Sequence, residues 1–204
     1  IQEPLVETLA DGSTAPLLAV SWEISDDGLV YTFKLREAKF HDGSALDAAD
    51  VVYSLMKNKV SPQAKLKTPL ASVEKVEAVD DRTVRLTLSK PSKRLLKELG
   101  LAAGIIVPEG MHETHDINSE MIGTGPYVFG QYRPDVSLQL TRFDDYWGEK
   151  PFFTDVTERF IPDETAAINA RNGKVNGLHA RNGQVPVDEI QEKAAEQPKR
   201  AYEL

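Results

Sequence analysis

Hydrophobic and polar side chains alternate in several short stretches of the chain, which is the pattern of a strand with one buried face. Residues 20–24 and 29–36 flank an Asp27-Gly28 step, so they predict a β-hairpin closed by an Asp-Gly turn. In the second arm the odd-numbered positions are all apolar or aromatic. The aromatic residues that we expect in the core of this region are Trp22, Tyr31, Phe33 and Phe40.

The same alternation predicts two further hairpins and one more strand. The second hairpin joins residues 72–79 to residues 83–88 through a polar turn, and the third joins residues 127–132 to residues 136–142. Residues 156–161 predict the additional strand. The side chains expected to share one face of the third hairpin are Val136, Leu138 and Leu140.

Apolar residues at helical spacing mark one clear helix. Asp47 is placed to cap its amino end, and Asp50 falls in the first turn, where the helix dipole favours an acidic side chain. We expect this helix to run to about Lys57. The residues predicted to pack inward from it are Val51, Val52, Leu55 and Met56.

Other segments are shorter or less regular. Residues 57–68 are polar, contain Pro62 and predict a loop. Ser92 is placed to cap a short helix that Gly100 ends, and residues 105–107 predict a short strand.

The remaining chain continues the irregular order of elements. Residues 110–121 predict a loop with one helical turn, and residues 163–170 and 186–195 predict helices. Residues 175–178 predict a short strand. Hairpins mixed with short helices indicate a mixed α/β fold of the α+β class.

Composition narrows the classes of protein that this chain could be. It has 204 residues, no cysteine and a formal net charge of −8. An acidic chain is a poor candidate for binding nucleic acid, because phosphate contacts need a clustered basic surface. The lack of cysteine excludes disulfides, thiolate catalysis and cysteine-ligated metal. No apolar run approaches the ~20 residues of a membrane-spanning helix.

The first residue is Ile1, and no charged segment followed by an apolar one, as in a secretion signal, comes after it. We therefore expect either that a leader has been removed or that the sequence is a piece of a longer protein.

Side chains that could carry catalysis are few. His112 and His115 lie beside Glu113 and Asp116, but their spacing matches neither the two-histidine zinc helix nor an EF-hand loop, so a solvated loop is the preferred interpretation. The sequence has no Gly-x-Ser-x-Gly elbow and no glycine-rich phosphate loop. It therefore does not support an enzyme, and it predicts no cofactor and no metal site.

Several ordered segments resemble one known family. The matches are collinear over roughly residues 3–178, and their ordered combination is specific although each segment alone is weak. The chain resembles the family-5 extracellular solute-binding proteins of ABC importers, the cluster that includes oligopeptide-, dipeptide- and nickel-binding proteins. The segments that carry the resemblance are Leu18–Arg36, Lys39–Gly43, Ala48–Leu55, Gly123–Tyr127, Asp145–Gly148 and Ile161–Asp163.

The resemblance implies a periplasmic-binding-protein type II clamshell, of which residues 1–204 would form part of lobe I. Within it we expect a smaller, hairpin-rich subdomain at about residues 15–108 and a portion of the main lobe at about residues 120–180. The second lobe would be absent, and so would the family's opening strand before Glu3.

The resemblance also implies a role. The protein would bind a small solute, most simply a peptide, outside the cytoplasm and deliver it to the membrane permease of an ABC importer, either in the periplasm or as a lipoprotein at the cell surface. The cleft face left exposed without the second lobe could associate with another copy of the chain. The residues predicted to bind the solute are Gly123, Thr124, Gly125, Tyr127, Tyr146 and Trp147.

Each of these residues also has a structural interpretation. Gly123 and Gly125 would allow a tight turn or a close backbone approach, with or without a ligand nearby. Tyr146 and Trp147 could stack on a solute or pack beneath a loop.

Two other functions remain as alternatives. The same lobes occur fused to DNA-binding domains, so the chain could be the ligand-sensing domain of a transcription regulator. A hydrolase would need a nucleophile–base pair or a metal cluster, and the sequence presents neither.

Overall fold

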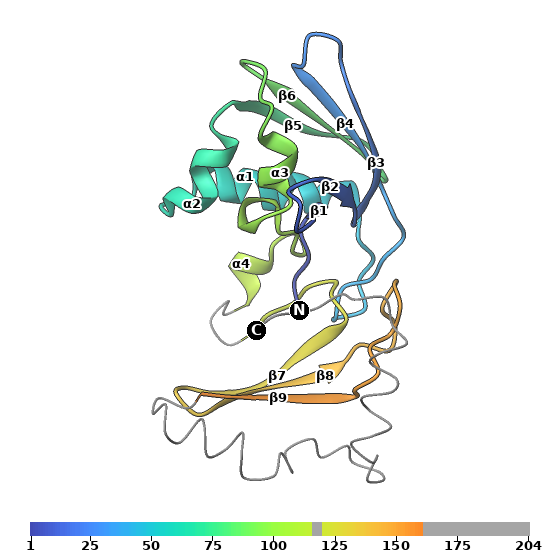
Figure 1. The fold of residues 1–204 in the computed structure, drawn as a ribbon, viewed down its shortest axis with the longest axis vertical. Coiled ribbons are helices and arrows are strands. Elements are labelled where there is room, and N and C mark those ends of the chain that lie inside the picture. Colours follow the sequence, from blue (N-terminus) through green and yellow to red (C-terminus); the bar gives the residue numbers. More distant parts are fainter. Residues whose placement is uncertain (116–119, 161–204) are drawn as a thin grey trace. The chain divides into compact units, whose positions relative to one another are not determined.

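The computed structural model describes residues 1–115 and 120–160 (Figure 1). The chain divides into two compact units, the first made of Ile1–Gly130 and Arg142–Pro151 and the second of Gln131–Thr141 and Phe152–Leu204. The elements predicted at residues 163–170, 175–178 and 186–195 lie outside the described residues.

A four-stranded antiparallel sheet forms the centre of the first unit, with strand order β3-β4-β6-β5. It consists of β3 (Ala19–Ile24), β4 (Val30–Leu35), β5 (Val73–Asp80) and β6 (Thr83–Leu88). The first two predicted hairpins are therefore confirmed. The Asp-Gly turn is confirmed as well, because Gly28 adopts a positive φ of 69° there.

The register of this sheet explains its core. Phe33 lies opposite Trp22 on β3 and opposite Val84 on β6, so these three side chains share one face. Phe33 and Val84 are completely buried, whereas Trp22, which we expected in the core, is only partly buried and packs against its margin. Trp22 stays accessible because β3 is the edge strand of the sheet.

Helix α1 (Ala48–Val60) packs on this sheet through β5 and β6 (Figure 1). Asp47 caps it as predicted, accepting hydrogen bonds from the backbone of residues 49 and 50, while the Asp50 side chain accepts one from the Asp47 backbone. The helix ends at Val60 rather than near Lys57.

The inward face of α1 is narrower than the sequence pattern suggested. Val51 and Leu55 are buried, Val52 is only partly buried and Met56 is 38% exposed. Met56 was wrongly predicted to pack inward. The buried face also includes three small or polar residues, Ala48, Asp50 and Ser54, so it lies away from Met56.

The connections contain short elements that the sequence analysis missed. The expected loop at residues 57–68 includes the end of α1 and helix α2 (Ala64–Lys67), which continues into the 3₁₀ turn η1 (Thr68–Leu70). Strands β1 (Val6–Thr8) and β2 (Thr14–Pro16) form a small sheet of their own.

Three further segments complete the first unit. Helix α3 (Leu95–Leu99) ends at Gly100 as predicted, but it begins after Arg94, without the expected cap from Ser92. The 3₁₀ turn η2 (Ala102–Gly104) precedes the expected strand at residues 105–107, where only an isolated bridge between Ile105 and Pro4 forms. Helix α4 (Met111–Thr114) is the predicted helical turn.

The third hairpin is confirmed as well. Strands β7 (Tyr127–Arg133), β8 (Ser137–Arg142) and β9 (Asp155–Arg159) form an antiparallel sheet in the order β7-β8-β9. Val136 does not share a strand face with Leu138 and Leu140, because it lies in the turn before β8 and is 56% exposed.

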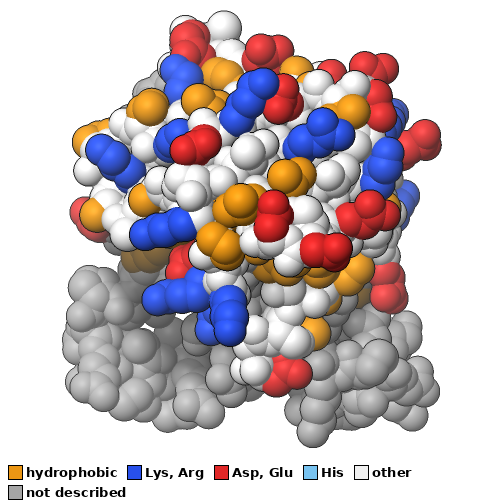
Figure 2. Space-filling model, turned by 90° about the horizontal axis from the view of Figure 1, so that it is seen from above, with side chains coloured by type: hydrophobic (Ala, Val, Ile, Leu, Met, Phe, Trp, Pro, Cys, Tyr) orange, Lys and Arg blue, Asp and Glu red, His pale blue; other side chains and the backbone are white. Residues whose placement is uncertain are grey.

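The surface seen in Figure 2 interleaves acidic, basic and hydrophobic side chains. None of the helices in residues 1–115 and 120–160 is long and apolar enough to cross a membrane. The fold class is thus the predicted one, a mixture of antiparallel sheets and short helices.

Candidate functional site

A hollow of about 260 Å³ lies on the first unit, between the amino-terminal segment and helices α1, α2 and α4. Its lining combines apolar side chains with amide, hydroxyl, imidazole and ammonium groups, and Lys65 is the one charged residue among them. The lining residues are Gln2, Ser54, Asn58, Gln63, Lys65, Leu66, Ala102, Ile105, Val107, Met111, His112 and Met121.

Polar side chains fix the floor of this hollow by bonding to backbone. Ser54 exchanges hydrogen bonds with the backbone of Val107, at 3.0 and 3.1 Å. Asn58 donates to the carbonyl of Ala103 at 3.1 Å, and Gln2 donates to the carbonyl of Ile122 at 3.2 Å. Gln63 and Lys65 are exposed at the rim. The polar groups of the floor are therefore paired within the protein, whereas those at the rim are exposed to solvent.

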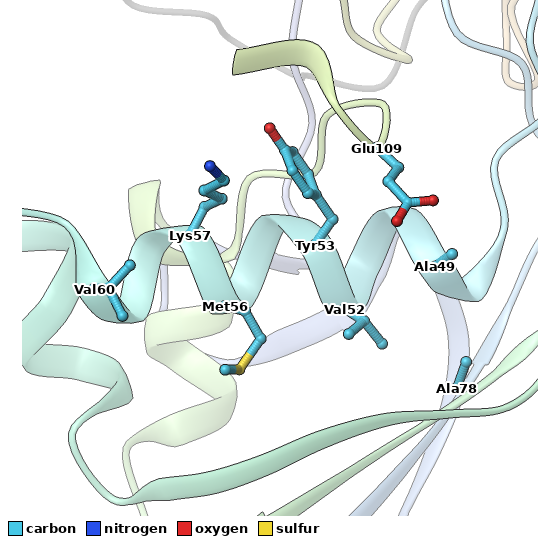
Figure 3. Close-up of a pocket in the computed structure, with 8 residues that line it drawn as sticks. All are labelled: Ala49, Val52, Tyr53, Met56, Lys57, Val60, Ala78 and Glu109. Carbon is cyan, nitrogen blue, oxygen red and sulfur yellow. The ribbon is translucent and has the colours of Figure 1, made fainter. Parts of the chain in front are cut away.

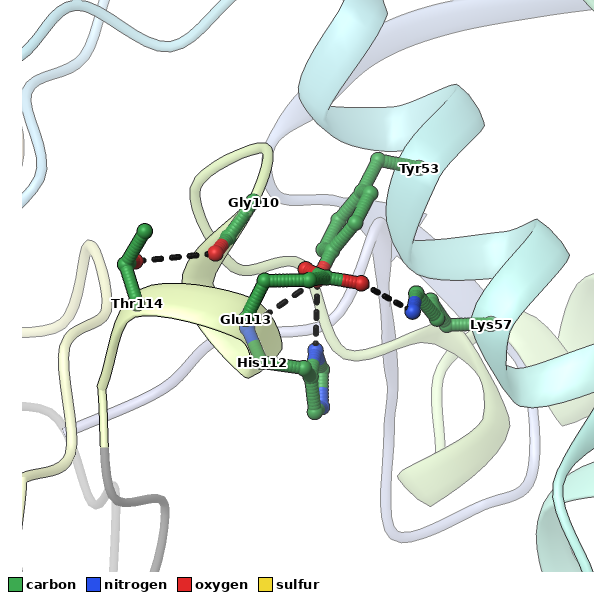
Figure 4. A network of polar contacts seen from close by, with 6 residues as sticks. All are labelled: Tyr53, Lys57, Gly110, His112, Glu113 and Thr114. Atoms are coloured by element: carbon green, nitrogen blue, oxygen red, sulfur yellow. Dashed lines mark hydrogen bonds and ion pairs between the residues drawn. The ribbon is translucent and has the colours of Figure 1, made fainter.

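A network between α1 and α4 holds His112 beside the hollow (Figure 4). The Tyr53 hydroxyl accepts a hydrogen bond from the backbone N–H of His112 at 3.0 Å and donates one to Glu113 at 2.5 Å. Lys57 forms an ion pair with the same Glu113 carboxylate. Burial, followed by the bond to Glu113, raises the pKa of Tyr53, so its hydroxyl stays protonated as this donor.

The predicted turn at Gly123–Tyr127 adjoins the hollow through Met121 and Gln2. Gly125 donates a backbone hydrogen bond to the carbonyl of Ile1 at 2.8 Å. A Cβ atom on either Gly123 or Gly125 would lie 2.5 Å from that carbonyl oxygen, so both positions require glycine. The sequence analysis suggested that these glycines allow a close backbone approach, and the backbone that approaches them is that of the amino-terminal segment.

The imidazole ring of His41 contacts the backbone of this turn. Its Nδ1 accepts from the backbone N–H of Gly123 at 3.3 Å, and its Nε2 lies 2.9 Å from the carbonyl oxygen of Gly125. These two partners select the neutral tautomer with the proton on Nε2. Burial is the main cause that lowers the pKa of His41, which further favours the neutral ring. Phe143 contacts the ring edge-on, with centroids 5.0 Å apart.

Three of the predicted residues converge on one buried carboxylate, that of Glu3. Thr124 and Trp147 both donate to its Oε2, at 2.8 and 2.9 Å, and Tyr146 donates to its Oε1 at 2.9 Å. The guanidinium carbon of Arg36 lies 3.5 Å from the centroid of the Trp147 ring. The structural interpretation of Trp147 therefore holds, because its ring packs against Arg36 and its N–H is paired with Glu3.

Tyr127, the remaining predicted residue, is half-buried in the same unit. Burial raises the pKa of its hydroxyl, and the nearby Arg142 opposes the shift. The strand predicted at residues 175–178, which we expect on the same side of the molecule as these two turns, lies outside the described residues.

Sequence reasoning missed Glu3, Arg36 and the hollow itself. One feature of the sequence could have pointed to Glu3, because it is an acidic residue directly before the apolar run Pro4-Leu5-Val6. A carboxylate buried with such a run needs hydrogen-bond partners. The partners lie more than 120 positions away, so no local pattern identifies them.

A second, larger hollow of about 500 Å³ lies along α1 (Figure 3). Its lining is mostly apolar and includes Met56, whose side chain points into it together with Val52. The remaining lining residues are Ala49, Tyr53, Lys57, Val60, Ala78 and Glu109.

The family model of the bacterial extracellular solute-binding proteins, family 5 Middle, matches residues 13–201. The chain belongs to this family. It is 33% identical over 195 residues to the nickel-binding periplasmic protein of Escherichia coli K12, covering 92% of this chain but 37% of that relative. This sequence therefore spans little more than a third of the length of that relative.

Solved structures agree with the assignment. AgaA of A. tumefaciens R10, determined in complex with agropinic acid, is 36% identical with a TM-score of 0.77, over 83% of this chain and 35% of that one. DppA of Helicobacter pylori, in complex with the peptide STSA, is 31% identical with a TM-score of 0.75, over 85% and 40%. Both are binding proteins that hold small molecules, and the fold described above is part of theirs.

Proposed function

We propose that this chain forms part of the first lobe of an extracytoplasmic receptor that binds a small solute, most simply a short peptide, and presents it to the permease of an ABC importer. Family membership supports the role. The relatives with named transport ligands favour transport over the alternative of a sensor domain in a transcription regulator.

The observation that carries the proposal is the hollow between the amino-terminal segment and helices α1, α2 and α4. A solute site is a concave, largely apolar surface with a few oriented polar groups. Apolar Leu66, Met111 and Met121 and polar Gln63 and Lys65 give the hollow that character. The lysine, with no acidic residue among the lining side chains, suits the carboxylate of a peptide.

We propose further that two turns complete this face, as the sequence predicted: the Gly123–Tyr127 turn, which adjoins the hollow, and the turn that holds Tyr146 and Trp147. Their members are Gly123, Thr124, Gly125, Tyr127, Tyr146 and Trp147. In a clamshell receptor the second lobe closes over such a face, and the permease recognises the closed form.

Calorimetric titration with a mixture of di- to pentapeptides tests this function. A complete receptor that binds at about 1 μM gains roughly −8 kcal/mol, and half of those contacts would leave a Kd near 1 mM. The isolated chain should therefore bind weakly, and the complete receptor tightly. Low-micromolar, saturable binding by the isolated chain would contradict a site that is shared between two lobes.

A pair of lysine variants locates the site within the complete receptor. Lys65→Ala should weaken peptide binding about tenfold, the loss of one charge-assisted hydrogen bond. Lys90→Ala removes another exposed lysine, outside the hollow, and should leave binding unchanged. Equal affinity in the unaltered receptor and both variants would show that the solute binds outside the hollow.

We also propose that the isolated chain associates with itself through the uncovered face, since Met121 at the rim of the hollow is 38% exposed. Light scattering on a sizing column should show a mass that rises with concentration, and Met121→Lys should reduce it. A monomer at all concentrations would contradict this association.

A further inference from the structure

Glu3 is a buried carboxylate with an unusual set of partners. It is 8% exposed, and it accepts hydrogen bonds from a hydroxyl, a phenol and an indole, all within 2.9 Å. The three donors come from two separate turns, one holding Thr124 and the other holding Tyr146 and Trp147. One side chain therefore ties together both turns of the proposed solute-binding face.

The donors need an oxygen acceptor at this position. The indole N–H can only donate, and in this arrangement both hydroxyls donate as well, so the carboxylate of Glu3 accepts three bonds through its two oxygens. Glutamine could keep the cluster, because its oxygen could accept from the indole and its NH₂ group could donate to the Tyr146 hydroxyl. Methionine has a similar length and no oxygen, so it removes the acceptor of all three donors.

Arg36 completes the arrangement from the other side of the indole. Its guanidinium carbon lies 3.5 Å from the centre of the Trp147 ring, in the geometry of a cation–π contact. Its position is fixed in turn by a hydrogen bond from Nε to the carbonyl of Leu17. The indole of Trp147 is thus held at its N–H by Glu3 and on its ring face by Arg36.

We propose that Glu3 is the positioning residue of the solute-binding face, acting through Trp147 and Thr124 rather than by touching the solute. The inference rests on the proposed function, since a positioning residue needs a site to position. Thr124 stands between Gly123 and Gly125, so its bond to Glu3 also fixes the turn that adjoins the hollow.

The chain offers a direct probe, because it has two tryptophans and the other one, Trp22, belongs to β3 and is not a partner of Glu3. In a Trp22→Phe background, the fluorescence of Trp147 reports on this residue alone. Glu3→Met should shift its emission to longer wavelength and raise its acrylamide quenching constant about twofold, because the indole loses its buried acceptor. Glu23→Met makes the same substitution at an exposed position and should change neither value.

Far-UV circular dichroism and a cooperative melt show whether each variant is folded. If Glu3→Met does not fold, Tyr146→Phe removes one hydroxyl from the same carboxylate and keeps its ring, so it should produce a smaller change of the same sign. A folded Glu3→Met protein with an unchanged Trp147 signal would overturn the proposal. If only Tyr146→Phe folds, an unchanged signal in that variant would overturn it.

Peptide titration of the complete receptor separates this inference from the proposed function. Glu3→Met should weaken peptide binding about tenfold while Glu23→Met leaves it unchanged. Absence of peptide binding by the unmodified receptor would contradict the proposed function, whereas unaltered affinity in a Glu3→Met receptor whose Trp147 signal has changed would overturn the positioning role alone.

Discussion

The two larger sheets of this protein share one sequence pattern and differ in burial. In the four-stranded sheet the inward side chains of Phe33, Val84 and Leu86 are completely buried. In the sheet of β7, β8 and β9 the corresponding apolar residues, Leu138 and Leu140, are only half-buried, and Ser137 alone among the residues of these strands is buried.

The difference shows what alternation does and does not predict. A period of two makes a strand with two unlike faces, but it does not say whether another layer covers the apolar one. The four-stranded sheet has such a layer in α1, which packs on β5 and β6. We therefore expect the stability of the chain to depend on the four-stranded sheet far more than on the sheet of β7, β8 and β9.

The largest expected effect is in the four-stranded sheet. Phe33→Ala empties a completely buried position between Trp22 and Tyr31 and should cost about 3–5 kcal/mol of unfolding free energy. Denaturant melts measure it, with Phe33→Leu as a variant that retains most of the volume and costs less. A loss below about 1 kcal/mol would mean that the buried face carries little of the stability.

A matched leucine in each sheet gives the most direct comparison. Leu86→Ala should cost about 2–5 kcal/mol, because Leu86 is completely buried. Leu140→Ala removes a half-buried side chain whose cross-strand neighbour is Val156 and should cost about 1 kcal/mol or less. Equal losses in the two melts would abolish the distinction between the sheets.

Helix α1, which covers the four-stranded sheet, depends on a single capping residue at its amino end. Asp47→Ala deletes the cap that holds the backbone N–H groups of residues 49 and 50, at an expected cost of about 1 kcal/mol. Asp26→Ala, at an exposed turn, serves as the control in the same thermal melts. A cost no greater than that of the control would show that the capping box contributes nothing.

The smallest expected effect is a pH dependence of folding stability that comes from His41, which belongs to neither of the two larger sheets. The pKa of His41 is lowered in the folded protein, chiefly by burial, so the unfolded chain binds its proton more readily. Folding stability should therefore fall as the pH drops below about 6.5, the ordinary histidine value, and continue to fall until the folded ring is also protonated.

His41→Gln isolates this contribution, because it removes the titrating ring and leaves Asp42 and the amino group of Ile1, the two charges that act on His41, in place. Between pH 7 and pH 5 the variant should lose less stability than the unaltered chain. Parallel profiles in denaturant melts would show that His41 carries no linked proton.

Most of the fold was predictable where one segment of sequence carries the whole signal. The Asp27-Gly28 turn and the Asp47 cap depend on neighbours a few residues away, and both are confirmed. Ser92 shows the limit of such local rules, since the same cap chemistry was expected there and the helix begins three residues later. Met56 shows another limit, because its burial depends on which side of α1 meets the sheet.

The candidate site was predictable only in part. The glycines and aromatic residues of the two turns stand out in the sequence, yet their contacts with Glu3 and Ile1 require the folded chain. The hollow is assembled from the amino-terminal segment, three helices and their connections, so no single stretch of sequence describes it.

The bonds of Glu3 also bear on the order of events during synthesis. Their donors follow Glu3 by 121, 143 and 144 positions, whereas the strands of the four-stranded sheet all lie within residues 19–88. The sheet can therefore assemble while the partners of Glu3 have yet to be translated. The glutamate carboxylate must stay hydrated until Trp147 leaves the ribosome, and closing so long a loop makes this among the slowest contacts to form. The segment around Glu3 is made well before its partners and is on this view among the last to reach its final place.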